Sequence, residues 1–291
     1  MVCGRVNYSI CIPTLDAAVL WEKLWLSIRA QTLQPHEVIV LDSSSTDSTT
    51  ELVQNSGCRV VSISRAEFRH GGTRQYAAKL AGSADVLVYL TQDSILADAN
   101  ALARLVAAFE DTSVGAAYGR QLPRPGANPI EAHARLFNYP PVSALRSIAS
   151  VRDIGFKAIF FSNSFGAYRK TALERAGGFP LDSNFGEDTV IAGRLLQTGW
   201  RIAYVADAQA YHSHAYSCRE EFQRYYRIGH LHESEPWLMR DFGEATGEGR
   251  QFAISEIQYL SRHAPWLIPE AMLRSGLKYL GYRRGRRSLK R

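Results

Sequence analysis

The first 110 residues alternate between short apolar runs and segments with helical spacing, and this alternation constrains the fold more than any other feature. Runs rich in β-branched residues predict strands at 8–12, 37–41, 59–63 and 85–90. Apolar residues with helical spacing predict helices at 18–31, 45–55, 72–81 and 99–110. A β-α-β-α order is typical of an α/β fold, so we expect a mostly parallel sheet flanked by helices.

The pattern changes after residue 121. Five prolines between residues 122 and 141 exclude one long helix there and predict a loop with a short helix. The next predicted elements are a strand at 157–161, a short helix at 171–176, a helix at 188–198 and a strand at 201–205. From residue 217 the pattern is mostly helical, apart from a Gly-rich stretch at 243–249. We therefore expect an α/β domain over residues 1–215 and a helical C-terminal region over 216–291.

The positive charge is concentrated at one end of the chain. There are 34 Lys and Arg against 28 Asp and Glu, and residues 282–291 hold six cations and no acid. The other 281 residues are therefore formally neutral. A nucleic-acid-binding surface usually spreads Lys and Arg over the fold, so we do not expect nucleic acid as a partner. With 46% hydrophobic and 21% charged residues, the chain is not expected to be disordered.

Cysteine usage and hydropathy bear on the compartment. The four cysteines form no CxxC pair and no zinc-ligand spacing, which indicates free thiols in a reducing compartment; they are Cys3, Cys11, Cys58 and Cys218. There is no secretory-signal pattern, and no window approaches the ~18 apolar residues of a membrane span. We expect a cytoplasmic protein whose contact with a membrane is peripheral.

Two carboxylates lie within three residues of the ends of predicted strands, Asp42 after Leu41 and Asp93 after Leu90. In open parallel sheets, ligands bind beyond the carboxyl ends of the strands. Asp42 precedes a run of hydroxyl side chains, which favours contact with a nucleotide base or ribose; the alternative is a Ser-rich loop with a helix N-cap. Asp93 suits Mg²⁺ or Mn²⁺ holding a diphosphate; the alternative is an ordinary turn residue.

Three further clusters contain side chains that are common in catalytic, metal-binding or phosphate-binding sites. Glu187 and Asp188 open a helix whose dipole keeps them ionised, as a general base requires; simple dipole complementation is the alternative. His212 and His214 share one face of an extended segment and could hold a metal or phosphate, or lie on a surface strand. The stretch 68–74 has two glycines for close backbone approach and two arginines for phosphate, or is a flexible connection.

Several of these motifs together resemble family 2 inverting glycosyltransferases with the GT-A fold. The similarity covers about residues 6–215 and includes 9–14, 37–47, Thr91-Gln92-Asp93 and Gly186-Glu187-Asp188. A more particular set resembles bacterial rhamnosyltransferases that build O-antigen and related polysaccharides: His70-Gly71-Gly72-Thr73-Arg74, Leu90-Thr91-Gln92-Asp93 and His212-Ser213-His214.

The resemblance implies a role for each matched position. Pro13 and Thr14 would border the base, and Asp42 would contact its imide or the ribose. Asp93 would hold Mg²⁺ or Mn²⁺, with His212 or His214 completing the metal or diphosphate shell. In the Glu187-Asp188 pair, Asp188 would deprotonate the acceptor hydroxyl. The other donor-binding positions expected are Ser44, His70, Gly71, Gly72, Arg74 and Gln92.

One departure from the family concerns the metal. The usual Asp-x-Asp is Thr91-Gln92-Asp93 here, so the first Asp is missing. Metal binding would then depend on one carboxylate, the diphosphate and a histidine.

The implied reaction is a single displacement on a nucleotide sugar, with dTDP-L-rhamnose as the expected donor. The expected acceptor is a hydroxyl of a glycan, usually lipid-linked, in bacterial surface polysaccharide synthesis. A basic C-terminal segment with apolar positions from Trp266 to Leu280 resembles an interfacial helix on an anionic membrane. This would place the protein at the inner face of the cell membrane. A solvated basic tail after a core helix is the alternative.

Three other functions remain open at this point. The enzyme could use a UDP- or GDP-sugar instead. A nucleotidyltransferase could share the sheet, but it would not need the Glu187-Asp188 pair. A non-enzymatic basic binding module could use the tail alone, but the clustered polar residues would then have no role.

Overall fold

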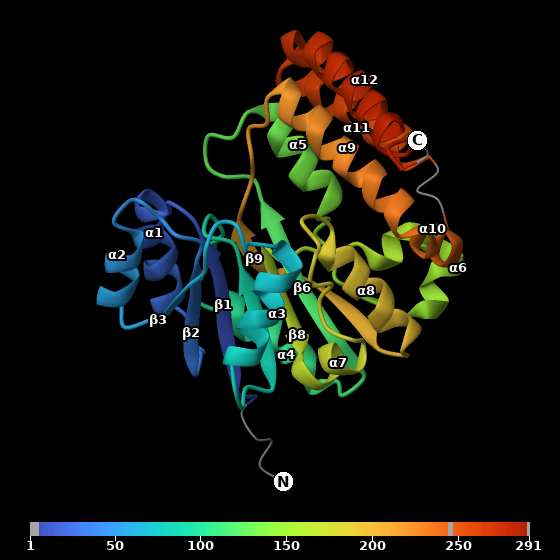
Figure 1. Ribbon diagram of the computed structural model, residues 1–291. Coiled ribbons are helices and arrows are strands. Elements are labelled where there is room, and N and C mark those ends of the chain that lie inside the picture. Colours follow the sequence, from blue (N-terminus) through green and yellow to red (C-terminus); the bar gives the residue numbers. More distant parts are fainter. Residues whose placement is uncertain (1–5, 244–246, 290–291) are drawn as a thin grey trace. The chain divides into compact units, whose positions relative to one another are not determined.

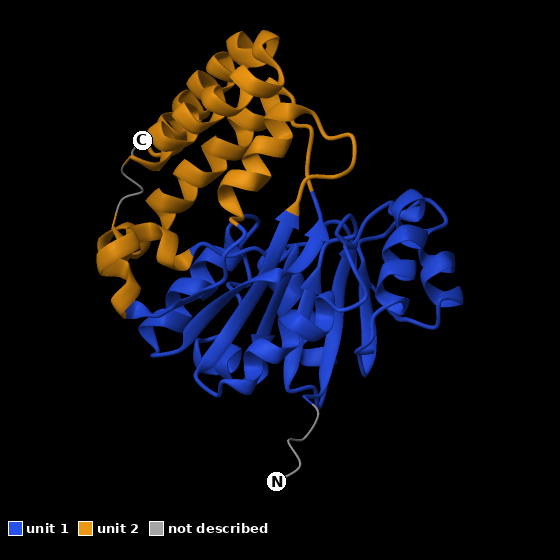
Figure 2. Ribbon diagram, turned by 180° about the vertical axis from the view of Figure 1, so that it is seen from behind, with its two compact units in different colours: residues 1–121, 141–148, 160–212 blue, residues 122–140, 149–159, 213–291 orange. Residues whose placement is uncertain are grey.

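The computed structural model describes residues 6–243 and 247–289, which form two compact units (Figure 2). The first unit comprises residues 1–121, 141–148 and 160–212, and the second comprises 122–140, 149–159 and 213–291. The sequence predicts a single boundary after residue 215. The division found differs, because two earlier segments belong with the C-terminal helices.

The first unit opens with four parallel strands connected by helices (Figure 1). The strands are β1 (Tyr8–Thr14), β2 (Glu37–Asp42), β3 (Arg59–Ser62) and β4 (Val86–Leu90). The helices are α1 (Ala18–Arg29), α2 (Thr49–Asn55), α3 (His70–Leu80) and α4 (Ala101–Ala107). All eight overlap the predicted elements. β1 pairs in parallel with β2 and β4, and β2 pairs in parallel with β3, as the β-α-β-α order predicts.

Beyond β4 the sheet is mixed, because β8 pairs antiparallel with β4 and β6, and β9 pairs antiparallel with β5 and β7. In the described residues its order is β3-β2-β1-β4-β8-β6-β9-β5, with β7 paired to β9. These later strands are β5 (Ile95–Leu96), β6 (Val114–Leu122), β7 (Ala144–Arg146), β8 (Phe165–Arg169) and β9 (Arg201–Tyr211). The sequence did not indicate β6 and β8, whose glycines weaken the apolar pattern. A Cβ on Gly119 would lie 2.3 Å from the Phe165 ring, so a neighbouring side chain fills that space.

The predicted strand at 157–161 is wrong. Residues Gly155–Ile159 form a 3₁₀ turn after the short helix α6 (Val151–Ile154). Gly155 ends α6 with a φ of +52°, and Ile159 is fully buried. A short buried apolar run does not by itself distinguish a strand from a helical turn. The helices α7 (Lys170–Arg175) and α8 (Glu187–Gln197) agree with prediction, and β9 extends beyond the predicted 201–205.

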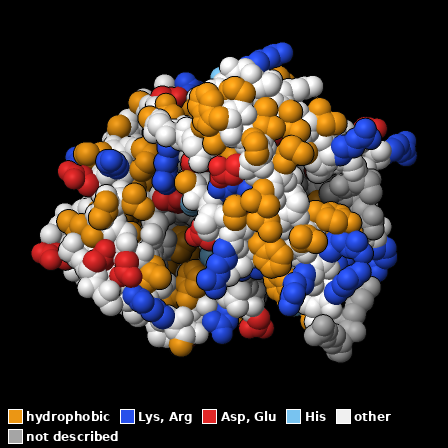
Figure 3. Space-filling view, turned by 90° about the horizontal axis from the view of Figure 1, so that it is seen from above, with side chains coloured by type: hydrophobic (Ala, Val, Ile, Leu, Met, Phe, Trp, Pro, Cys, Tyr) orange, Lys and Arg blue, Asp and Glu red, His pale blue; other side chains and the backbone are white. Residues whose placement is uncertain are grey.

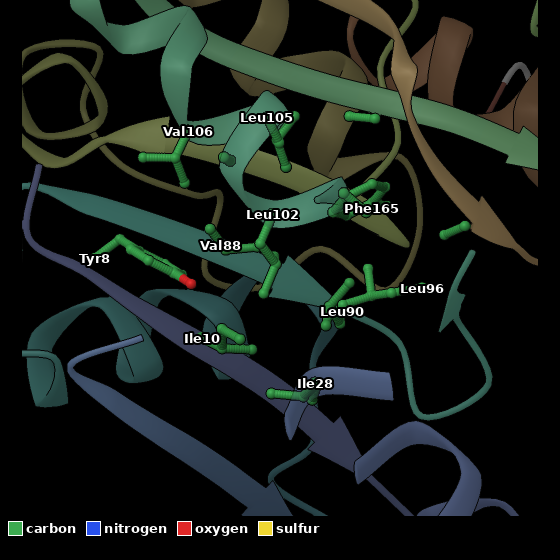
Figure 4. Close-up of a cluster of buried hydrophobic side chains, with 14 of the residues drawn as sticks. Tyr8, Ile10, Ile28, Val88, Leu90, Leu96, Leu102, Leu105, Val106 and Phe165 are labelled. Carbon is green, nitrogen blue, oxygen red and sulfur yellow. The ribbon is translucent and has the colours of Figure 1, made fainter. Parts of the chain in front are cut away.

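Alternating residues of the strands build two packed faces. On one face, Ile10 of β1 and Val88 of β4 contact a cluster that includes Ile28 of α1 and Leu102 of α4 (Figure 4). On the other face, Tyr89 donates its hydroxyl to the carbonyl of Arg74 in α3, at 2.9 Å. The sheet is therefore held between helices, and the ends of its strands are fixed in place.

The start of α3 packs directly against the loop that precedes α8. The amide of Gly71 donates to the carbonyl of Ser183 at 3.0 Å, and the amide of Phe179 donates to Gln75 Oε1 at 2.8 Å. The ring of Phe179 contacts Tyr89, with centroids 5.3 Å apart. A Cβ on Gly71 would lie 1.8 Å from the carbonyl oxygen of Pro180, so only glycine fits there.

The second unit is a group of helices. They are α5 (Pro129–Asn138), α9 (Cys218–Ser234), α10 (Pro236–Phe242), α11 (Glu248–His263) and α12 (Ile268–Gly285). α9 begins with a capping box between Ser217 and Glu220. α12 packs closely on α9, because a Cβ on Gly285 would lie 2.0 Å from the carbonyl oxygen of Tyr226. The expected loop with a short helix at 122–141 and the helical character after residue 217 are confirmed; part of the Gly-rich stretch, 244–246, lies outside the described residues.

Two sequence expectations concern thiols and membrane spans. Cys11, Cys58 and Cys218 are free, as predicted, and Cys3 lies outside the described residues. Within 6–243 and 247–289, none of the helices has the length and apolar character needed to cross a bilayer.

A buried group of charges lies between α9, α11 and α12. Glu221 contacts Arg274 and Lys278, with N–O distances of 3.6 and 3.5 Å. Glu256 is 1% exposed, and its Oε1 has no hydrogen-bond partner. Burial raises the pKa of the Glu256 carboxyl, Lys278 and Arg274 lower it, Glu221 raises it, and the net pKa is about 7. The unfolded chain releases this proton near pH 4.5, so the folded state binds the proton more strongly.

We therefore expect Glu256→Gln to stabilise the protein near pH 7. In the wild type, stability is lost as pH rises from about 4.5 to about 7, because the buried carboxyl must ionise. The substitution should raise the free energy of unfolding at pH 7 by roughly 2 kcal/mol, and the gain should vanish below pH ~4.5. Urea unfolding at both pH values measures this. Glu174→Gln, at an exposed position, is the control; a gain independent of pH would contradict the explanation.

Candidate active site

A pocket lies at the carboxyl ends of β1, β2 and β4, where the topology predicts a ligand. The predicted donor-binding residues Pro13, Thr14, His70, Arg74 and Gln92 line it. Leu15, Ser43, Arg65, Phe68 and Thr91 complete the lining. Of these, Leu15 and Arg65 belonged to no predicted cluster, although they follow the ends of β1 and β3, where the same topological rule points.

Asp42 is held rigidly at the end of β2. Its side chain is buried and accepts hydrogen bonds from the Ser45 amide at 2.9 Å and the Ser45 hydroxyl at 2.5 Å. The Thr14 hydroxyl also donates to it, at 3.3 Å. The carboxylate therefore organises the turn after β2, and the predicted contact with a base or ribose would add to these bonds.

The turn after Asp42 brings a cation to the pocket. Ser44 has a φ of +60°, and its hydroxyl donates to the carbonyl of Ile63 at 2.9 Å. Arg65 donates to the Ser44 carbonyl at 3.3 Å and pairs with Asp16 at 3.0 Å. Hydrogen bonds from Thr46 hold the pKa of the Asp16 carboxyl below its usual value, and Arg65 lowers it further. Ser44 thus supports Arg65, which lines the pocket.

Gln92 fastens β1 to β4 at the pocket. Its Oε1 accepts the Leu15 amide at 2.8 Å, and its Nε2 donates to the Leu15 carbonyl at 3.1 Å. This two-point contact uses both ends of the amide, so it specifies Gln rather than Glu or Leu. It also fixes the backbone that carries the next residue, Asp93.

The segment 68–74 contributes His70 and Arg74 to the pocket, whereas its glycines contact protein. The rings of Phe68 and His70 meet edge to face, 4.9 Å apart. Arg74 donates to the carbonyl of His70 at 3.1 Å. Gly71 and Gly72 lie against the carbonyls of Pro180 and Leu181, which accounts for both glycines without a ligand. Their predicted contact with the donor stays a prediction.

Asp93, His212 and His214 come together as a group that could hold a metal ion. Their potential ligand atoms all lie within 4.8 Å of one another. His212 is buried, and its Nε2 lies 3.4 Å from an oxygen of Asp93. His212 Nδ1 lies 3.0 Å from Gln121 Oε1, and Gln121 Nε2 donates to the Ser162 hydroxyl at 2.8 Å.

Gln121 determines which nitrogen of His212 faces Asp93. Because its Nε2 donates to Ser162, its Oε1 is left to accept Nδ1–H of His212. Nε2 is then the nitrogen next to Asp93, and it is the one available to a metal ion when the imidazole is neutral. Sequence reasoning missed Gln121, because no spacing links residue 121 to residue 212.

The adjacent acids Glu187 and Asp188 have different environments. Glu187 is 5% exposed and pairs with Arg74 at 3.0 Å, while Asp188 is half-buried in the first turn of α8. Burial raises the pKa of the Glu187 carboxyl, but Arg74, His70 and the amide of Asn163 lower it, and the net pKa lies below the usual value. Glu187 is therefore an ionised, committed partner of Arg74.

Asn163 and Tyr168 complete the surroundings of Glu187. Asn163 Nδ2 donates to Glu187 at 3.0 Å, and its Oδ1 accepts the Tyr168 hydroxyl at 2.8 Å. Burial raises the pKa of Tyr168 well above its usual value, and the charges of Asp188 and Glu187 raise it further, so its hydroxyl remains a donor. Neither residue was predicted, since an isolated Asn or Tyr gives no sequence signal.

The arrangement combines the parts of a group-transfer site. A pocket with arginines, a possible metal group and a half-buried carboxylate all involve the carboxyl-end loops of one sheet. Such parts can bind an anionic leaving group and remove a proton from a nucleophile.

Comparisons with known proteins agree with this chemistry. The sequence profile described as "Glycosyl transferase family 2" matches residues 9–177, which is more than half of the chain and ends before Glu187. The chain is 43% identical over 281 residues to the O-antigen chain rhamnosyltransferase WbaN of Salmonella anatum, covering 96% of this chain and 89% of that protein. It is 44% identical over 282 residues to the O-antigen chain rhamnosyltransferase RfbN of Salmonella typhimurium, covering 97% and 90%.

A solved structure supports the fold. The mannosyltransferase PcManGT from Pyrobaculum calidifontis, in complex with GDP-Man and Mn²⁺, superposes with a TM-score of 0.60 at 21% identity, covering 94% of this chain and 74% of that one. The expected GT-A architecture is thus confirmed, and the chain belongs to glycosyl transferase family 2.

Proposed function

We propose that the protein transfers L-rhamnose from dTDP-L-rhamnose to a hydroxyl of a lipid-linked glycan, in the synthesis of O-antigen. The observation that carries the proposal is the 43–44% identity, over nearly the whole chain, to two O-antigen chain rhamnosyltransferases. The pocket at the ends of β1, β2 and β4 then takes the nucleotide, with Thr14 and Asp42 on the base or ribose. Arg65 and Arg74 supply positive charge beside it.

Asp188 is the proposed base. It is accessible to solvent in part and lies at the N-terminus of α8, where the helix dipole keeps a carboxylate ionised. It takes the proton of the acceptor hydroxyl while that oxygen attacks the anomeric carbon and the nucleoside diphosphate leaves. A single displacement inverts the anomeric configuration, so a β-linked donor gives an α-L-rhamnoside.

Asp93, His212 and His214 are the proposed ligands of Mn²⁺ or Mg²⁺. Imidazole nitrogens beside a carboxylate suit Mn²⁺ better than Mg²⁺, which prefers oxygen ligands. The Gln121 bond that turns His212 Nε2 toward Asp93 fits this role. A bound cation would neutralise charge on the leaving diphosphate. Mn²⁺ is present in the PcManGT complex with its nucleotide sugar.

Nucleotide selectivity tests the donor. We expect dTDP with Mn²⁺ to raise the melting temperature more than UDP, GDP or CMP does, because binding to the folded state alone stabilises it. His212→Ala should remove most of the Mn²⁺-dependent part of the shift. Thermal shift assays with each nucleotide, with and without Mn²⁺, measure this. A preference for UDP or GDP would keep a glycosyltransferase but reject dTDP-rhamnose.

Removing the proposed base tests the mechanism. Asp188→Asn should lower turnover by ~10²–10⁴-fold, because the amide cannot accept the proton, and should leave dTDP binding unchanged. Rhamnosyl transfer at saturating donor and dTDP binding by calorimetry measure the two effects. Asp182→Asn, at an exposed position in the preceding loop, is the control. Normal turnover by Asp188→Asn would reject this residue as the base.

An anionic membrane surface is the proposed partner of α12. Glycine contacts bury one side of α12 against α9. The opposite side exposes residues at helical spacing, and Arg287 is exposed in the turn just after the helix; the helical residues are Met272, Leu273, Tyr279, Leu280, Arg283 and Arg284. Figure 3, which looks onto the helices at the top of Figure 1, shows hydrophobic and basic side chains gathered together there.

Two cations of this C-terminal segment face α9 and are therefore not part of the exposed basic surface. Lys278 pairs with Glu221, and Arg286 pairs with Glu233, so both are committed to α9. The cations that face outward are Arg283, Arg284 and Arg287, next to the exposed Leu280. Apolar side chains beside basic ones suit the interface of an anionic bilayer, where a lipid-linked acceptor resides. The last two residues, 290–291, lie outside the described residues.

Charge removal on this side should weaken vesicle binding. Replacing Arg283, Arg284 and Arg287 with Gln should lower affinity for phosphatidylglycerol vesicles by roughly 100-fold, since each cation contributes about 1 kcal/mol. Co-sedimentation at low salt measures binding. The matched control replaces three exposed cations of the first unit with Gln: Lys23, Lys79 and Arg175. Equal binding by both triple variants would reject α12 as the contact surface.

A further inference from the structure

Arg74 contacts both the proposed donor pocket and the residue next to the proposed base. It lines the donor pocket, and its Nη1 lies 3.0 Å from Glu187, the residue before the proposed base. Both side chains are almost completely buried, at 6% and 7% exposure. Removing one partner of such a pair leaves an uncompensated buried charge, so the two groups hold each other firmly.

The backbone around this pair is tied as closely as the side chains. Gly71 donates to Ser183, and Phe179 donates to Gln75, so α3 bonds to the loop at two points before the loop reaches α8. The absence of a side chain at Gly71 and Gly72 permits this approach. Any movement of α3 must therefore move the loop and the start of α8.

We propose that the buried Arg74–Glu187 pair couples the donor pocket to the proposed base, with Glu187 acting as a positioning residue for Asp188. This inference rests on the proposed function, in which Asp188 takes the acceptor proton. Glu187 and Asp188 are consecutive in α8, so anchoring Glu187 to Arg74 and Asn163 fixes the direction in which Asp188 projects. Donor phosphates that contact Arg74 would act on the same pair from the pocket.

The contacts of Glu187 argue against its acting as the base itself. Its Oε1 already meets both Arg74 and Asn163, at 3.0 Å each. A general base needs an oxygen that the acceptor hydroxyl can reach, and Glu187 is only 5% exposed. A carboxylate stabilised by an arginine is also a weak proton acceptor. Asp188, which is half-buried, has the accessibility that Glu187 lacks.

The coupling is tested with Glu187→Gln, Arg74→Gln and the double variant, beside Asp188→Asn. We expect each single variant to lower kcat by about 10- to 100-fold, and the double variant to be no worse than the more damaged single one. Glu187→Gln should also weaken dTDP binding several-fold, although Glu187 does not line the pocket. Asp188→Asn should leave that binding unchanged. Arg201→Gln, in the half-exposed pair with Asp111, is the control.

Because substitutions of the buried pair could unfold the protein, a milder variant tests the same coupling. Gly72→Ala places a Cβ 2.8 Å from the Leu181 carbonyl and should lower kcat by loosening the loop, whereas Gly249→Ala meets nothing within 4 Å and should not. Melting temperatures establish that each variant is folded.

Three results would overturn the coupling. The effects of Arg74→Gln and Glu187→Gln on kcat could multiply in the double variant, or Glu187→Gln could leave kcat and dTDP binding unchanged. The third is that Gly72→Ala has the same kcat as Gly249→Ala. The coupling is also overturned if Glu187→Gln abolishes turnover as Asp188→Asn does but binds dTDP normally. Normal turnover by Asp188→Asn would instead reject the proposed function.

Discussion

Parallel pairing of β1, β2 and β4 is the constraint on which the site depends. Parallel strands place all their carboxyl ends at one edge of a sheet, so the residues that follow Thr14, Asp42 and Leu90 meet although they are far apart in sequence. Backbone groups at that edge are not used by the ladder. Here they are organised by side chains of the same loops: Asp42 binds its own turn, and Gln92 clamps Leu15. The pocket is thus shaped by polar side chains that are already satisfied within the protein.

The strands beyond β4 contribute side chains that β1, β2 and β4 do not provide. β9 ends at Tyr211, just before His212, and β6 contains Gln121, which orients that histidine. β8 carries Tyr168, which bonds to Asn163 and through it to Glu187. The ends of β1, β2 and β4 thus shape the pocket, while β9 and β6 place and orient His212, and Tyr168 of β8 supports the contact between Asn163 and Glu187.

Sequence reasoning recovered the elements with a strong local signal and missed those defined by their neighbours. β1, β2 and β4 are apolar runs whose burial on both faces is visible in their composition, and the positions of Asp42 and Asp93 follow from the topology. β6 and β8 were missed because Gly119 and Gly166 leave space for Phe165 and Phe161, which is a tertiary effect. The strand predicted at 157–161 failed for the same reason, since a short apolar run is ambiguous without its packing partners. Gln121 contacts His212 and Asn163 contacts Glu187, both far along the chain, so no local spacing marks either residue.

Gly71 and Gly72 form a motif whose structural reason differs from the one that the sequence suggests. Glycines before a helix often permit approach of a phosphate, and the sequence supports that interpretation. In the structure the groups that approach are the carbonyls of Pro180 and Leu181, from the loop that leads to Glu187 and Asp188. The two motifs, separated by more than a hundred residues, therefore form one structural feature. Their sequences constrain each other through backbone contact, and the buried charge of Arg74 requires Glu187 as its partner. A substitution at Gly71, Gly72 or Arg74 therefore also disturbs the loop before α8 or the partner of Glu187.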